Sequence, residues 1–270
     1  NIRKKNILIN NVKTKSNYIV KANDKLKILN FHTDQYKNKI IYKKILKIPK
    51  KFIKLFNKSI ISENEEFLIL NKWASIASQG GSKINISIDD IIKHISPEYK
   101  LVHRLDKNTT GLLIISKKLS AAKVFGNLFK SKLISKTYLA ICEGVPKLRE
   151  SNVNLDIKDK FNKINITNTY YRVLNYKKGL SLILFKPITG KTHQLRIVSK
   201  NLGAPIVGDI KYNKSSKFIN DDLKLNAFNL KFTFNKKQYE YFSYLPKDFE
   251  FFLKKYKLNN PIKLKEQIKN

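Results

Sequence analysis

From residue 63 to the end, the chain alternates between two kinds of hydrophobic pattern. Short runs of β-branched and other apolar residues, such as EFLILNK, are typical of buried strands, whereas apolar residues three and four positions apart predict helices. Several predicted strands follow one another without an intervening helix. This order predicts an α+β fold with a mixed, mainly antiparallel sheet and flanking helices. The expected strands lie at 66–72, 101–105, 111–117 and 136–144, the hairpins at 170–187 and 224–245, and the helices at 87–95, 120–134, 192–203 and 248–258.

Residues typical of helix caps support these boundaries. Ser87 and Asp90 have the spacing of a capping box, in which two side chains bond to the backbone at the start of a helix. Ser120 is expected to cap the following helix. Gly203 lies just beyond another predicted helix, where glycine commonly ends helices in the left-handed conformation.

The first 62 residues are more densely basic than the rest of the chain. They carry a net charge of +15, against +20 for the much longer remainder. ILIN at 7–10 and DKLKIL at 24–29 predict two short strands, and Asn10-Asn11 predicts a turn. We expect a small domain at 1–32, a lysine-rich linker at 33–62 and a large domain at 63–270.

The net charge of +35 attracts polyanions, and nucleic acid is the first candidate partner. An acidic membrane surface is the second, but the chain has no apolar run of spanning length and no lipidation signal. The single cysteine, Cys142, excludes an internal disulfide framework and a cysteine-based zinc site, which agrees with a reducing cytoplasm. We also expect the protein to be a monomer. Since methionine is absent, even at position 1, we expect the sequence to be truncated.

Arginine is scarce, with 5 residues against 50 lysines, so each arginine is a candidate for a role that needs a planar fork of donors. Arg104 and Arg196 are the two strongest candidates. If 101–106 is a strand, Arg104 and Asp106 point to the same side, because residues two apart share a face. A carboxylate beside a guanidinium stays ionised and can act as a nucleophile or base. The alternative is an ordinary surface ion pair before a turn.

Four segments carry motifs whose combination is more specific than any one of them. They are NKWASIASQGGS at 71–82, VHRLDKNTTGLLIISKK at 102–118, KTYLAICEG at 136–144 and GKTHQLRIVSKNLGAPIVGDIKY at 190–212. Together they resemble the RluA-type pseudouridine synthases, nearest to the RluC branch. The N-terminal residues resemble the second half of an S4 RNA-binding domain. The resemblance implies a pseudouridine synthase fold preceded by a partial S4 domain.

The resemblance also implies a reaction and the residues that perform it. The reaction breaks the N1–C1′ bond of a uridine, rotates the uracil and rejoins it through C5, without a cofactor or a metal. Asp106 would be the nucleophile or electrostatic stabiliser, and Arg196 would pair with it, although Arg104 is an alternative partner. Tyr138 would lie against the target uracil as a candidate general base; its alternative is a core aromatic residue.

Further motif residues are implied as contacts to RNA or to the target base. An everted base leaves a space that a planar cation can fill, and this role is implied for Arg104. Structural roles are the alternatives for Lys72 and His193, and Gly208-Asp209 is expected to form a turn. The implied contacts are Arg104, Lys72, His193, Gln194 and Lys107.

Three positions of the first motif depart from the family pattern. Trp73, Ser75 and Gln79 stand where the family usually has Pro, Gly and His. None of these changes removes a group that the isomerisation requires, so they bear on the choice of substrate.

The sequence therefore predicts an RNA pseudouridine synthase. Its expected partner is RNA, namely bacterial large-subunit (23S) ribosomal RNA or its assembly intermediates. A transfer-RNA pseudouridine synthase is the rival among enzymes. A non-catalytic RNA-binding or ribosome-assembly protein is the rival from another class, against which Asp106, Tyr138 and Arg196 stand together. A metal-dependent nuclease is disfavoured because the chain lacks a carboxylate cluster.

Overall fold

The computed structural model of the chain describes residues 6–15, 17–29, 48–81, 84–158, 162–258 and 266. The chain divides into two compact units, residues 1–47 and residues 48–270. The first unit is small, and the second contains all of the motifs that resemble pseudouridine synthases.

The N-terminal unit contains a three-stranded antiparallel sheet of β1 (Ile7–Ile9), β2 (Val12–Lys13) and β3 (Leu26–Ile28), in the order β2-β1-β3. The predicted turn is confirmed. Asn10 and Asn11 join β1 to β2 with φ of 49° and 65°, in the left-handed region that asparagine tolerates. The identification of residues 1–32 as a partial S4 domain stays a prediction.

The predicted linker contains regular structure in its last part. Helix α2 covers Lys50–Lys58 and strand β4 covers Ile60–Glu63, so the linker prediction is wrong over these residues. The helix forms because Phe56, which is 1 % exposed, packs in an apolar cluster of the second unit while most of the lysines stay outside it. Residues 33–47 of the predicted linker lie outside the described residues.

The second unit is built on a ten-stranded sheet. Besides β4, its strands are β5 (Phe67–Lys72), β6 (Lys100–Leu101), β7 (Thr110–Ser116), β8 (Ser135–Glu143), β9 (Glu150–Lys158), β10 (Ile164–Lys177), β11 (Leu180–Pro187), β12 (Leu225–Phe234) and β13 (Lys237–Phe242). The main order is β4-β5-β7-β12-β8-β11-β10-β9, with β13 paired to β12 and β6 paired to β7. Strands β7 and β12 are parallel, and the other strand pairs described in this sheet are antiparallel, which confirms the predicted sheet type.

Four further helices pack on this sheet: α3 (Ile88–Ile95), α4 (Leu119–Lys130), α5 (Gln194–Asn201) and α6 (Lys247–Lys255). The capping box of Ser87 and Asp90 is present with both of its bonds, as predicted. The predicted Ser120 cap is wrong, because α4 begins one residue earlier and Ser120 lies inside its first turn. None of the helices described here is long and apolar enough to cross a membrane.

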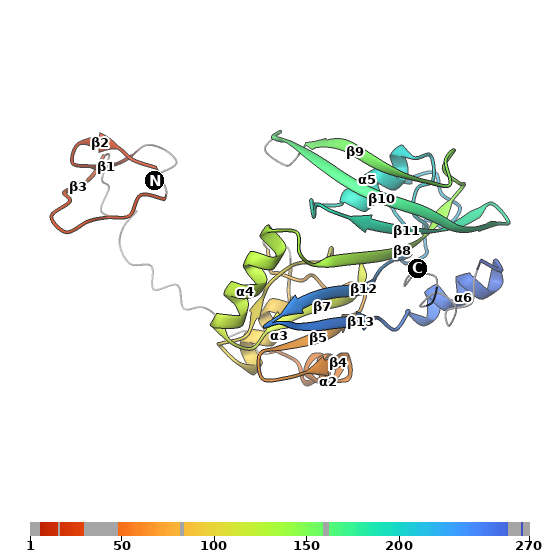
Figure 1. Cartoon of the computed structure of the whole chain (residues 1–270), viewed down its shortest axis with the longest axis horizontal. Coiled ribbons are helices and arrows are strands. Elements are labelled where there is room, and N and C mark those ends of the chain that lie inside the picture. Colours follow the sequence, from red (N-terminus) through yellow and green to blue (C-terminus); the bar gives the residue numbers. More distant parts are fainter. Residues whose placement is uncertain are drawn as a thin grey trace. The chain divides into compact units, whose positions relative to one another are not determined.

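Strands β8 and β12 lie in the middle of the sheet, between two groups of helices (Figure 1). Helices α3 and α4 lie near β6 and β7, whereas α5 packs near β9 and β10. Gly111 at the start of β7 has φ 104°, and a Cβ atom there would lie 2.3 Å from the Ala227 carbonyl oxygen of β12. Only glycine permits this approach. The chain segment that precedes β7 is thereby brought to the centre of the sheet.

Candidate active site

The segment 102–109, which carries the candidate nucleophile, is a loop, so the strand predicted there ends after its first residue. Hydrogen bonds that involve side chains hold the loop in place of a neighbouring strand. The Ser78 hydroxyl accepts a hydrogen bond from the Leu105 amide at 2.9 Å and donates one to the Leu105 carbonyl at 2.7 Å. The His103 ring accepts a bond from the Ile114 amide at 2.8 Å. These bonds replace the ladder that an extended segment would have made.

The loop also separates two residues that were expected to share a strand face. Arg104 is exposed, and its guanidinium donates to Oε1 of Gln79 at 3.3 Å. It makes no ion pair with Asp106 in the described structure, so the expected Arg104–Asp106 pair is wrong. Its exposed guanidinium lines the cleft described below, where a bound molecule can contact it.

Lys72 anchors the residue that follows Asp106. Its ammonium donates to the carbonyl oxygens of Lys107, Ile76 and Trp73 at 3.0–3.1 Å, and the side chain is 1 % exposed. Burial lowers the pKa of Lys72 to about 7, against an opposing effect of Asp106. An ammonium enclosed by three carbonyls cannot reach an RNA phosphate. The geometry therefore supports the structural alternative for Lys72.

The carboxylate of Asp106, placed by these anchors, lines a cleft of about 790 Å³ and an adjoining recess of about 90 Å³. Tyr138 lines both spaces, whereas His193 and Arg196 line the recess. The Asp106 side chain is 30 % exposed, and no described group donates a hydrogen bond to its carboxylate. Its oxygens are therefore accessible to a molecule that enters the cleft.

Most of the charged side chains that line the cleft are cations, which suits a polyanionic substrate. Two carboxylates, Asp89 and Asp106, face several basic residues. In the part of the chain that the structure describes, no group of three or more His, Cys, Asp or Glu side chains could hold a metal ion. The basic residues of the lining are Lys93, Lys100, Arg104, Lys107, Lys136 and Lys191.

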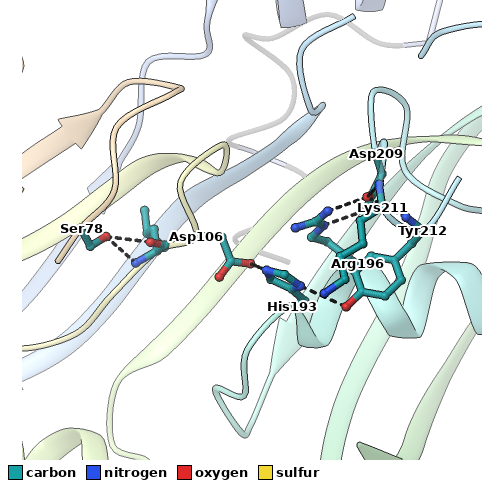
Figure 2. A network of polar contacts seen from close by, with 8 residues as sticks. Ser78, Asp106, His193, Arg196, Asp209, Lys211 and Tyr212 are labelled. Carbon is teal, nitrogen blue, oxygen red and sulfur yellow. Dashed lines mark hydrogen bonds and ion pairs between the residues drawn. The ribbon is translucent and has the colours of Figure 1, made fainter. Parts of the chain in front are cut away.

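His193 links Asp106 to the opposite wall, as Figure 2 shows. Its Nε2 lies 4.0 Å from Oδ2 of Asp106, and its Nδ1 lies 3.0 Å from the Tyr212 hydroxyl. The residue caps α5 in the left-handed conformation, with φ 56°, which turns the ring toward the recess. Burial lowers the pKa of His193; Asp106 opposes this effect, and Arg196 reinforces it. A neutral ring protonated on Nε2 can accept from the Tyr212 hydroxyl through Nδ1, whereas the 4.0 Å from Nε2 to Asp106 is too long for a hydrogen bond.

Arg196 pairs with Asp209 and not with Asp106 (Figure 2). Its Nε and a terminal nitrogen donate to the two oxygens of Asp209 at 2.7 and 2.6 Å, and its carbon Cζ lies 5.0 Å from the centre of the Tyr212 ring. The expected direct Arg196–Asp106 pair is therefore wrong in this structure. Burial opposes the charge of Arg196, but hydrogen bonds to Asp209 and the charges of Asp209 and Asp106 raise its pKa.

Tyr138 stands on β8, and its surroundings agree with the alternative of a core aromatic residue, whereas its contact with a uracil stays a prediction. It packs against two apolar clusters, and it also lines the cleft and the recess. Burial raises the pKa of Tyr138, and the Asp106 charge raises it further. The phenol therefore stays neutral, and a phenolate base is not available near neutral pH.

The two remaining predicted contacts differ in their access to the cleft. Gln194 is 4 % exposed and holds the 189–191 segment, because its Oε1 accepts from the Thr189 hydroxyl at 2.9 Å and the Lys191 amide at 3.0 Å. Its role in this structure is positioning of the cleft wall. Lys107 is exposed and lines the cleft, where it can meet RNA.

Sequence reasoning missed three residues that organise the site: Ser78, Asp209 and Tyr212. Asp209 lies in the predicted turn after Gly208, whose φ of 76° and close approach to the Asp222 carbonyl admit only glycine. The signal for its role was the Gly-Asp-x-x-Tyr spacing, which sets an acid and a ring beside the arginine of the preceding helix. Ser78 carried no signal of its own.

Comparisons with known proteins agree with this geometry. The sequence profile of a family described as RNA pseudouridylate synthase matches residues 66–201. A ribosomal large subunit pseudouridine synthase C of Rickettsia prowazekii is 38 % identical over 248 residues, which cover 85 % of this chain and 81 % of that protein. A protein of the same description from Buchnera aphidicola subsp. Baizongia pistaciae is 34 % identical over 85 % of this chain and 76 % of its own length.

A solved structure shows the same fold. Human RNA pseudouridylate synthase domain containing 4 superimposes with a TM-score of 0.69 at 24 % identity, over 78 % of this chain and 97 % of the human one. The matched profile covers half of the chain and includes the loop of Asp106, the strand of Tyr138 and the helix of Arg196. The chain belongs to the RNA pseudouridylate synthase family.

Proposed function

We propose that this RNA pseudouridine synthase isomerises uridines of large-subunit ribosomal RNA, with Asp106 as the residue that acts on the target nucleotide. Its relatives named ribosomal large subunit pseudouridine synthase C support the substrate. The observation that carries the catalytic assignment is the open carboxylate of Asp106, fixed by anchored neighbours in a cation-lined cleft.

The reaction is an internal rearrangement whose atoms balance without a co-reactant. The N1–C1′ bond breaks, a C5–C1′ bond forms, C5 loses a proton and N1 gains one. Asp106 can take part by adding to C1′, by adding to C6, or by assisting a glycal route. Each route uses a carboxylate oxygen that fixed donors do not occupy, as in this cleft.

Tyr138 and Arg104 supply the surroundings of the everted base. The neutral phenol ring in the wall of the recess offers an apolar surface beside Asp106 on which a uracil can stack. The exposed guanidinium of Arg104 can occupy the space that the base leaves in a helix, which offsets part of the cost of a few kcal/mol for unstacking. His193 completes the recess, with its Nε2 4.0 Å from Oδ2 of Asp106.

The test replaces Asp106 by asparagine, which keeps the shape and removes the charge and the nucleophile. Asp106→Asn should form no pseudouridine in transcripts of large-subunit ribosomal RNA, while its RNA affinity stays within a few-fold. Asp156→Asn, at an exposed position of β9, is the matched control and should turn over normally. Turnover by Asp106→Asn would refute the catalytic assignment.

The substrate is tested separately in cells. Pseudouridine mapping with and without the protein should show sites that are lost from large-subunit ribosomal RNA. Sites lost only from transfer RNA would contradict the proposed substrate and leave the role of Asp106 standing.

A further inference from the structure

Lys136 is a charged residue of the third motif that the proposed reaction leaves unused. It lies on β8 two residues before Tyr138, so the two side chains leave the strand on the same face. Both line the cleft that contains Asp106. The ammonium of Lys136 therefore belongs to the wall along which a bound RNA strand would run.

This ammonium has no partner in the described part of the chain. No described group accepts a hydrogen bond from it, and no described carboxylate lies within 4.0 Å of it. The two lysines that the structure describes as fully buried have partners: Lys72 donates to three carbonyls, and Lys224 donates to the Asp222 carbonyl and to Asp248, both at 2.8 Å. Lys136 is only half-buried, but a partly desolvated cation without a partner is still unfavourable, which favours an anionic ligand from outside the chain.

The surroundings of Lys136 offer no compensating negative charge. Burial lowers the pKa of Lys136, and no acid counteracts this effect. The nearby His103 stays neutral, because burial, together with the charge of Lys136, lowers its pKa to about 3. Its ring tilts against Phe129 with the centres 4.7 Å apart. Lys136 therefore shares the cleft lining with two uncharged aromatic side chains, His103 and Phe129.

We infer that Lys136 is a positioning residue that binds one phosphate of the RNA strand beside the everted uridine. The inference rests on the proposed function for the identity of the strand. A phosphate oxygen supplies the acceptor and the negative charge that Lys136 lacks. The contact would fix the register of the RNA strand on the protein. One particular uridine would then reach Asp106.

The first experiment measures RNA binding at several salt concentrations. Lys136→Met removes the charge, and the dependence of log affinity on log salt should become less steep by about 0.7 for one lost phosphate contact. Lys136→Arg should retain most of the slope. Lys231→Met, which removes an exposed lysine of β12 outside the cleft lining, is the control and should leave the slope unchanged.

The second experiment identifies the phosphate. Substrate RNAs carry one neutral methylphosphonate at each position around the target uridine in turn. With the wild-type protein, one position should weaken binding as much as Lys136→Met does, and with Lys136→Met that position should have no further effect. Equal effects of every position in both proteins would overturn the inference.

The third measurement distinguishes a binding role from a structural one. Because an unpaired, half-buried charge disfavours the free protein, Lys136→Met should leave its melting temperature unchanged or raise it, while it weakens RNA binding. A lower melting temperature with unchanged binding would show that Lys136 supports the fold. The two failures can be distinguished. If the wild-type protein shows the phosphate effect but forms no pseudouridine, only the proposed function fails. If it forms pseudouridine while Lys136→Met binds RNA like Lys231→Met, only this inference fails.

Discussion

Replacing Asp209 by alanine tests how the Arg196 side of the recess is held. The Asp209 side chain is fully buried and accepts two bonds from Arg196 and two from the backbone amides of Lys211 and Tyr212. Its removal leaves a guanidinium that is only 13 % exposed without its counter-ion. The same change frees the turn that carries Tyr212, and therefore the hydroxyl that contacts His193.

The expected loss of stability is large for a single substitution. Removing one partner of a buried ion pair costs about 3–5 kcal/mol, because the other charge stays buried and unpaired. In a unit of this size, each kcal/mol lowers the melting temperature by about 2–4 °C, so the change should lie at about 6–20 °C. The comparison is Asp89→Ala, which breaks a pair with Lys93, whose side chain is 55 % exposed. That variant should lose at most about 1 kcal/mol.

Urea unfolding followed by circular dichroism measures these costs. Arg196→Met and the double variant complete a cycle, in which Asp209→Ala should cost clearly less once the guanidinium is gone. Costs that simply add, or a loss below about 1 kcal/mol for Asp209→Ala, would refute the view that this pair holds the recess wall.

Two further predictions concern pH and salt. Because the pKa of Lys72 is lowered to about 7, the unfolded chain holds a proton between about pH 7 and 10 that the folded chain lacks. Wild-type stability should therefore rise with pH relative to Lys72→Met, by up to about 1.4 kcal/mol per unit, in unfolding curves; a parallel pH dependence would contradict this. If residues 1–47 bind phosphates, removing this unit should make RNA binding less dependent on salt in filter-binding titrations, and an unchanged slope would exclude that role.

The elements of the second unit could be predicted where local signals and tertiary packing agree. The capping box at Ser87, the hairpin turn at Gly179 and the alternating strand of Tyr138 all lie where the pattern places them. Helix α2 was not predicted because its many lysines are typical of a linker. Its apolar face becomes evident only from its packing against the core. Strand β9 was missed although Val153, Leu155 and Ile157 alternate with polar residues, a pattern typical of a strand with one buried face.

The site was harder to predict than the fold, because its contacts join segments far apart in the sequence. Ser78 bonds to Leu105 across 27 positions, which no local pattern encodes. The loop around Asp106 contains apolar residues that imitate a strand, but Leu105 is held by the Ser78 side chain instead. The predicted partner of Arg196 was wrong because motif spacing indicates which residues lie near the recess. It does not indicate whether the arginine pairs with Asp106 or with Asp209.

The observed pairing gives a physical reason for a basic protein to place one acid between cations. Asp209 offsets the charge of Arg196, so the guanidinium is held in the recess without occupying the oxygens of Asp106. A carboxylate that accepted bonds from fixed donors would be less basic and less nucleophilic. Most of the basic residues of the site lie along the wider cleft, and the His193 ring lies 4.0 Å from Oδ2 of Asp106. Under the proposed function, RNA binding depends on the basic residues of the cleft and the reaction depends on Asp106. A mutation that changes one of these properties should therefore not abolish the other.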